Sequence, residues 1–132
     1  FGRGDYRLQP IYVEDLADLA VAQAQDDRNA VMDAVGPEVL TFEELVLTLR
    51  RAVGSRALIL HTPPALALLL SRAVGFLMRD VVLTRDEVEG LMANLLIGDG
   101  PPTGPTRLSD WVAANADRVG RSYHSEVARH YR

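Results

Sequence analysis

The chain has 132 residues, of which 48% are hydrophobic and 24% are charged, and its formal net charge is −4 at pH 7. This length and composition fit one globular domain and argue against disorder. An acidic chain lacks the basic surface that binds nucleic-acid phosphates, so we expect no nucleic-acid partner. The sequence contains no cysteine, which excludes disulfides and thiolate chemistry.

All 14 basic residues of the chain are arginine, so the sequence contains no lysine. This excludes chemistry that needs a lysine side chain, such as Schiff-base formation, the P-loop lysine and the tyrosine–lysine pair of short-chain dehydrogenases. Arginine cannot replace lysine as an acid–base group because its pKa lies far above neutral pH. No apolar stretch reaches the roughly 18–20 residues that span a bilayer. We therefore expect a cytoplasmic protein, or one that lies at the periphery of a membrane.

The first predicted element is a strand over residues 7–13, and a helix follows it without an intervening turn. Pro10 lies inside this strand and cannot donate a ladder hydrogen bond, so the strand is expected to be short or to lie at a sheet edge. Glu14 and Asp15 fall in the first turn of the helix, where the helix dipole favours negative charge. We interpret this acidic pair as a helix start, and a catalytic dyad is the alternative.

Two further strands are predicted, over residues 30–36 and 57–63, and a strongly patterned helix lies between them. Thr41 and Glu44 match a capping box at the start of this helix. Apolar residues then recur on one helical face as far as Val53.

The next predicted helix covers residues 64–78 and is apolar around most of its circumference. One face of it carries six apolar residues: Leu66, Leu69, Leu70, Ala73, Phe76 and Leu77. Such a helix is either buried in a core or meets a partner or membrane surface. Core burial is the commoner use of this pattern, so we expect this face to point inward.

A second capping box, formed by Thr84 and Glu87, predicts the start of another helix. Residues 98–107 are rich in glycine and proline and are expected to form a loop before the C-terminal helices. Ser109 is placed to cap the first of these helices, and residues 122–131 are expected to form a short tail helix.

Together these elements predict a single α+β domain over residues 1–132, with a small three-stranded sheet and about five helices. No set of residues in it has the spacing of a catalytic or metal site, so we predict neither. The histidines and serines weighed for such roles are His61, His124, His130, Ser109, Ser122 and Ser125.

Three stretches resemble NAD(P)-dependent epimerase/dehydratase-like proteins, the extended and atypical short-chain dehydrogenases. Residues 11–17, IYVEDLA, match the family's pattern of an apolar residue, an aromatic or histidine, valine, an acid, aspartate and Leu/Val-Ala. Residues 35–45, VGPEVLTFEEL, resemble its next landmark, a Gly-Pro-Glu turn before a capped helix. Residues 83–92 are similar to a later segment of the atypical branch, which includes the accessory NADPH-binding subunit of respiratory complex I.

This resemblance implies that the chain is the C-terminal, substrate-side portion of such a protein. In the family, an N-terminal Rossmann domain carries the glycine fingerprint and the tyrosine–lysine pair, and neither occurs here. We therefore expect this chain to bind no cofactor and to be inactive as a fragment, with NAD or NADP bound by the full-length protein. Its expected partner is its own N-terminal Rossmann domain.

The resemblance places three substrate-side candidates in the first strand: Arg7, Gln9 and Tyr12. Sugar-nucleotide epimerases carry a phosphate-binding arginine at the position that Leu8 occupies here. Arg7 is one residue away and would face the other side of a strand, which puts a nucleotide-sugar substrate in doubt. Structural roles are the alternative for all three residues, because polar residues of an edge strand usually face water.

A second hypothesis belongs to a different class of function. The chain could be a helical interaction module that docks on a membrane or a protein complex through residues 64–78. A fragment without its Rossmann domain exposes apolar surface, so we also expect it to form a homodimer or to self-associate, with Leu68, Val74 or Met78 near the contact.

Overall fold

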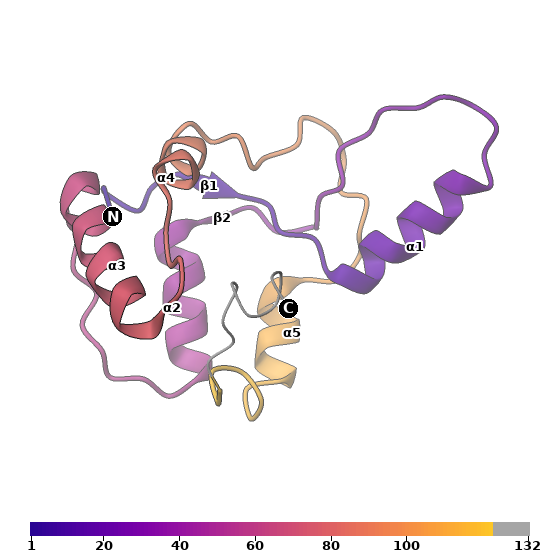
Figure 1. The fold of residues 1–132 in the computed structure, drawn as a ribbon. Coiled ribbons are helices and arrows are strands. Elements are labelled where there is room, and N and C mark those ends of the chain that lie inside the picture. Colours follow the sequence, from indigo (N-terminus) through magenta and orange to yellow (C-terminus); the bar gives the residue numbers. More distant parts are fainter. Residues whose placement is uncertain (123–132) are drawn as a thin grey trace.

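The computed structural model describes residues 1–122 of the chain (Figure 1). These residues form five helices and a short two-stranded sheet. In chain order the elements are β1 (Arg7–Leu8), α1 (Val13–Ala24), β2 (Leu40–Thr41), α2 (Phe42–Ala52), α3 (Pro64–Met78), α4 (Arg85–Met92) and α5 (Leu108–Ala114).

The predicted three-stranded sheet is wrong, because only the first of the three predicted strands pairs. β1 and β2 are antiparallel, with Arg7 opposite Thr41 and Leu8 opposite Leu40. One isolated parallel bridge joins Leu8 to Leu96. The ladder stops before Pro10, which has no N–H to continue it. Residues 1–122 are therefore mostly helical.

The two other predicted strands use their backbone groups differently. In residues 30–36, the Val35 carbonyl accepts hydrogen bonds from the backbone N–H groups of Thr103 and Gly104, so a loop takes the place of a partner strand. Residues 57–63 run extended without a strand partner, and a single bond, from the Gly2 N–H to the Thr62 carbonyl, ties their end to the N-terminal segment. A short hydrophobic run can predict an extended backbone. It does not predict a sheet, which also requires a second strand to pair with.

The helices lie where the sequence pattern predicts them, and both capping boxes are formed. The prediction that Ser109 caps a helix is wrong, because α5 begins at Leu108 and its N-cap position, Arg107, makes no side-chain cap. The Thr41 hydroxyl accepts a hydrogen bond from the Glu44 N–H, and the Glu44 carboxylate accepts one from the Thr41 N–H. Thr84 and Glu87 repeat this arrangement at the start of α4. Most of the predicted tail helix falls in 123–132, which lie outside the described residues.

The hydrophobic core is small. Its buried apolar residues are Tyr6, Leu8, Val35, Val88 and Val112. The chain exposes 10030 Å² of surface at a mass of 14.5 kDa, whereas a compact monomer of that mass exposes about 6,900 Å². Much apolar surface is therefore left open.

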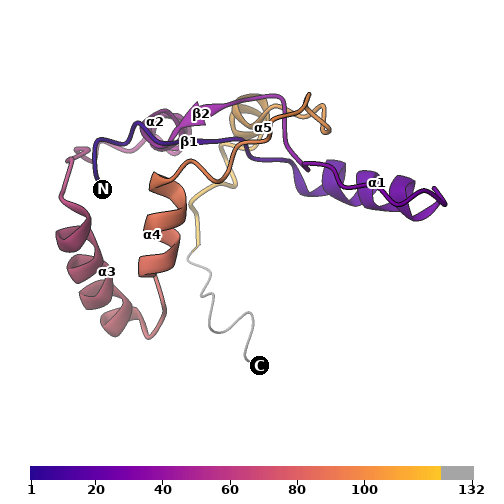
Figure 2. The same ribbon diagram turned by 90° about the horizontal axis from the view of Figure 1, so that it is seen from above.

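The elements are spread along one direction, with α1 at one end and α3 at the other (Figures 1 and 2). Between these ends, α2 packs against α5 and β2, and α4 contacts β1. Within residues 1–122, α1 and α3 each make at most a marginal contact with any other helix or strand. Both ends of the molecule are thus loosely packed, and the densest contacts lie between them.

Candidate functional site

Three segments distant in sequence meet beside the start of α1, and we call them the junction: residues 9–15, 33–38 and 98–109. Gly36 and Pro10 bring the first two segments into contact. A Cβ atom at Gly36 would overlap the carbonyl oxygen of Pro10, so no other residue fits this position without a backbone shift. The same Cβ atom would lie 3.4 Å from the Ile11 Cα, so two of the three stretches that carry the family resemblance touch through their backbones.

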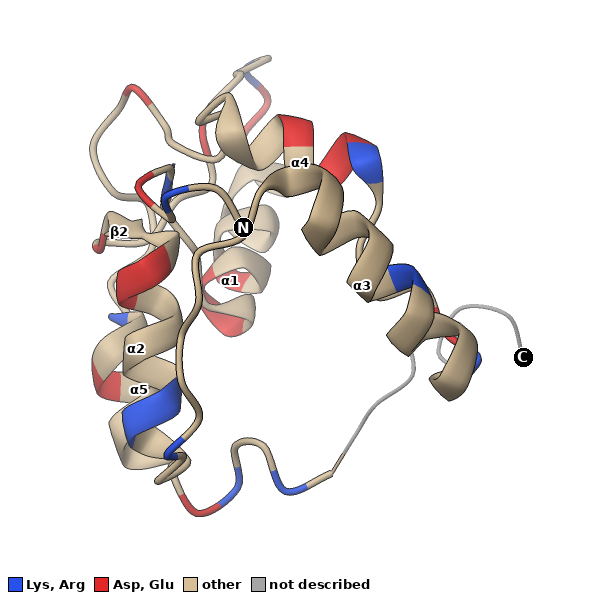
Figure 3. Cartoon of the chain, turned by 90° about the vertical axis from the view of Figure 1, so that its left-hand side faces the viewer, with Lys and Arg blue, Asp and Glu red and all other residues tan. Residues whose placement is uncertain are grey.

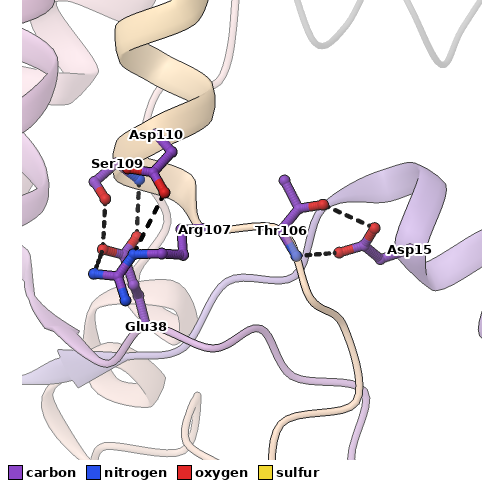
Figure 4. A network of polar contacts seen from close by, with 6 residues as sticks. All are labelled: Asp15, Glu38, Thr106, Arg107, Ser109 and Asp110. Atoms are coloured by element: carbon purple, nitrogen blue, oxygen red, sulfur yellow. Dashed lines mark hydrogen bonds and ion pairs between the residues drawn. The ribbon is translucent and has the colours of Figure 1, made fainter.

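Asp15 fastens the third segment to α1 (Figure 4). Its carboxylate accepts a hydrogen bond of 2.8 Å from the Thr106 N–H and one of 3.0 Å from the Thr106 hydroxyl. A Cβ atom at Gly104 would lie 2.9 Å from the same carboxylate, so the loop passes close over the helix start. The acidic pair is thus a helix start, as predicted, and its second member also holds a loop.

Glu38 makes the denser set of contacts (Figure 4). Its carboxylate accepts hydrogen bonds from the Ser109 hydroxyl at 2.6 Å, the Ser109 N–H at 2.8 Å and the Arg107 guanidinium at 2.7 Å. Arg107 also lies 3.6 Å from the exposed carboxylate of Asp110. Glu38 itself is only 8% exposed.

The surroundings of Glu38 keep it ionised. Burial by itself raises the pKa of this carboxyl, but the hydrogen bonds from Ser109 and the charge of Arg107 outweigh burial and hold the pKa below its ordinary value. A carboxylate with a lowered pKa and three donors is a poor proton acceptor. Glu38 is therefore a structural anion, and the Ser109 hydroxyl bonded to it is no free nucleophile.

Gln9 is buried and bridges the other two segments of the junction. Its amide nitrogen donates to the Gly36 carbonyl at 2.8 Å, and its amide oxygen accepts from the Gly98 N–H at 3.2 Å. It also lines a pocket of about 400 Å³ beside residues 33–35 and 95–98. Both the nitrogen and the oxygen of the Gln9 amide already form hydrogen bonds within the chain, so a ligand in this pocket would contact an amide whose partners are in place.

Tyr12 lies half-buried at a second pocket, of about 230 Å³, between the start of α1 and α5. Its ring centroid lies 6.0 Å from that of Trp111. Pro10 and Ile11 line both this pocket and the one at Gln9. Two of the three predicted site residues therefore lie at neighbouring pockets.

Arg7 is not part of either pocket. Its side chain is exposed, and within residues 1–122 the guanidinium forms no hydrogen bond or ion pair, while its backbone N–H donates to the Asn94 side chain at 2.6 Å. β1 is only two residues long, but its side chains still alternate between the two faces of the strand. Arg7 points to solvent and Leu8 is buried. The structure thus does not gather the three candidates into one cavity.

An apolar groove of about 460 Å³ lies between α2 and residues 57–61. At its N-terminal end the rings of Phe1, Tyr6 and Phe42 cluster with centroids 5.1–5.5 Å apart. Burial raises the pKa of Tyr6 to about 12, with a smaller contribution from Asp5. Few polar groups converge on this groove, so it offers packing surface and no evident chemistry.

Sequence reasoning missed the ties of Asp15 and Glu38 to residues 106–109, and it missed the pairing of Tyr12 with Trp111. The Gly-Pro-Glu turn was a signal for a constrained segment, but its partners lie about 70 residues away in sequence.

No metal-binding cluster of three or more histidine or acidic residues occurs in the described part of the chain. His61 lies 3.7 Å from the Glu43 carboxylate at the surface. His124, His130 and Ser125 lie outside the described residues. Between residues 1 and 122, no helix combines the length and the hydropathy needed to cross a membrane.

Within residues 1–122, no strand leads through a glycine-rich turn into a helix. The glycine-rich loop contains Pro101 and Pro102, which lack the N–H groups that hold phosphate. Comparison with protein-family models, with curated proteins and with solved structures gives no match for this chain.

Proposed function

We propose that this chain is the substrate-side domain of an NAD(P)-binding epimerase/dehydratase-like protein and is not catalytic by itself. The observation that carries the proposal is the junction. The Gly-Pro-Glu turn and the segment that ends in Glu14-Asp15 were related only by resemblance to one family, and they meet where Gly36 contacts Pro10. Their acids, Asp15 and Glu38, both hold residues 106–109. A shared structural role supports the view that both motifs come from one fold.

In this proposal the dinucleotide and the tyrosine–lysine pair belong to a Rossmann domain outside these residues. NAD or NADP would supply hydride transfer there. The residues of this chain would form the wall that the substrate meets. Arg7 is suited to bind an anionic group because its guanidinium is exposed and unpaired within the described residues. Gln9 and Tyr12 would each border one of the two neighbouring pockets. A cytoplasmic location is part of the same proposal.

Calorimetric titration with NADH and NADPH tests this assignment. We expect no heat of binding to the isolated chain at millimolar ligand, whereas the product of the complete reading frame should bind one dinucleotide per chain. Saturable binding to the isolated chain with micromolar affinity would contradict the proposal. A complete protein that binds neither dinucleotide would contradict it as well.

A second candidate function, a helical interaction module, is favoured by the exposure of α3. The face that carries Phe76 and Leu77 is largely open to solvent, since these side chains are 88% and 83% exposed. This function needs no dinucleotide anywhere in the protein, so the same titration of the complete protein separates the two candidates.

A further inference from the structure

The apolar stripe of α3 is uncovered. We use this name for Leu66, Leu69, Leu70, Ala73, Phe76 and Leu77, the face that the sequence predicts to point inward. All six residues are exposed, with the five larger ones between 43% and 88%. The prediction of core burial is therefore wrong for this face.

The opposite face of α3 is the one that meets the chain. Gly75 is the only buried residue of the helix, and a Cβ atom there would meet the carbonyl oxygen of Asp80 in the turn that follows. Leu68 and Arg72 line a groove toward α4, together with Val88 and Met92 of that helix, and Leu69 at the edge of the stripe also borders it. The rest of the stripe lies away from this groove.

We propose that the stripe is the contact through which two copies of this chain form a symmetric dimer. Its residues follow each other at intervals of three and four, which is the spacing of a seam between two packed helices. In an antiparallel pair that crosses at Ala73, Leu69 of one copy lies opposite Leu77 of the other, and Leu70 lies opposite Phe76. The small Ala73 side chain at the crossing allows the usual axial separation of about 8–10 Å.

Charge supports a second copy as the occupant. Figure 3 shows that α3 carries little charge, whereas α2 carries both acidic and basic residues. An uncharged stripe is complementary to itself, as a two-fold interface requires. A helix that lies on anionic lipid usually has a polar face rich in lysine and arginine. Here Arg72 is the one charged residue of α3. The whole chain has a net charge of −4, which an anionic bilayer would repel.

The exposed area is also sufficient. The five large side chains of the stripe are 43% to 88% exposed. If each contributes on the order of 100 Å², two copies bury about 1,000 Å² in total, which is the lower limit for a specific interface. Since α1 and the junction lie toward the other end of the molecule (Figure 1), a domain that covers them would leave the stripe accessible. The inference therefore does not depend on the proposed function.

Light scattering after gel filtration, across a hundredfold range of concentration, tests the dimer. We expect the mass to rise from 14.5 kDa to twice that value. Leu70→Glu and Leu77→Glu should each stay monomeric, with unchanged circular dichroism as the check on folding. Val31→Glu is the matched control, because Val31 is fully exposed in the loop after α1, and this variant should still dimerise.

The absence of cysteine allows a second, independent measurement. A disulfide requires Cα atoms within about 7 Å, so Ala73→Cys should form a disulfide-linked dimer on mild oxidation if the helices cross there. Ala20→Cys, on the exposed surface of α1, should not. A monomeric mass at every concentration would overturn the proposal, as would a dimer that survives both glutamate substitutions. A monomer that floats with vesicles of anionic lipid would show that a membrane covers the stripe instead.

Discussion

The junction and α3 are opposites in how they use their side chains. At the junction, the polar groups of Gln9, Asp15 and Glu38 all have partners at hydrogen-bonding distance. On α3, the largest apolar side chains, such as Phe76 and Leu77, have lost little of their contact with solvent. One region is held together by polar contacts in the interior, and the other shows apolar residues at the surface.

This contrast teaches that residue type alone does not indicate role. Paired acids suggest catalysis, but Asp15 and Glu38 act as acceptors that hold a loop and a helix start. An apolar helix suggests a core, but the best-patterned face of α3 is outside the core. In both cases the partner decides the role: donors from residues 106–109 at the junction and, as we propose, a second copy of the chain for α3.

The largest effect is expected from the closest contact at the junction. Gly36→Ala places a Cβ atom on the Pro10 carbonyl and should lower the free energy of unfolding by about 3 kcal/mol. Gly90→Ala is the control, because a Cβ atom there meets nothing within 4 Å and α4 should gain about 0.5–1 kcal/mol. Urea unfolding measures both. If Gly36→Ala is as stable as the unchanged chain, the backbones of the two motif segments do not meet.

The next effect concerns the Glu38 carboxylate. Glu38→Gln removes the negative charge to which Arg107 and Ser109 donate hydrogen bonds. It should lower the free energy of unfolding by about 1.5–3 kcal/mol. Asp110→Asn is the matched control, because Asp110 also faces Arg107 but is exposed, and it should change stability by less than about 0.5 kcal/mol. If both variants lost the same free energy of unfolding, the buried Glu38 would contribute no more to stability than the exposed Asp110, and the prediction would be wrong.

The same carboxylate predicts a dependence on pH. The folded state lowers the pKa of Glu38, so the unfolded state binds the proton more readily. Its contribution to stability is therefore present above the ordinary pKa of 4.5 and is lost as the pH falls through the lower, folded value. The stability difference between Glu38→Gln and the unchanged chain should shrink over that acidic range. A constant difference would mean that the carboxylate does not titrate with folding.

A smaller effect is expected at the two capping boxes, which lie outside both the junction and α3. Thr41→Ala at α2 and Thr84→Ala at α4 should each cost about 0.5–2 kcal/mol, because each removes a side chain that accepts from a helix N–H. Thr48→Ala, in the interior of α2, should cost less. If Thr48→Ala were the most damaging of the three in urea, the helix starts would be misplaced.

Local patterns predicted the helices, because a capping box such as Thr41–Glu44 and a 3.6-residue period involve only neighbours in sequence. The sheet was not predictable in the same way. Residues 30–36 have a strand-like composition, but the Val35 carbonyl bonds to the 103–104 loop, nearly 70 residues later. Of the candidate site, the start of α1 at Glu14 and Asp15 was predictable and the partners of Asp15 were not. Such contacts depend on the tertiary arrangement of distant segments, and the periodicity of a local sequence pattern does not determine that arrangement.

The smallest effect is predicted on α3, and it is the sharpest test of the contrast. Leu77→Ala removes a large side chain that is 83% exposed, so little burial is lost within one copy. At a dilution where the chain is monomeric, this substitution should change the free energy of unfolding by less than about 0.5 kcal/mol. Val112→Ala removes less volume from a site that is 2% exposed, and it should cost about 2 kcal/mol because it leaves a cavity. If the order were reversed in dilute solution, Leu77 would belong to the core of the single chain, and the stripe would have no free surface to offer a second copy.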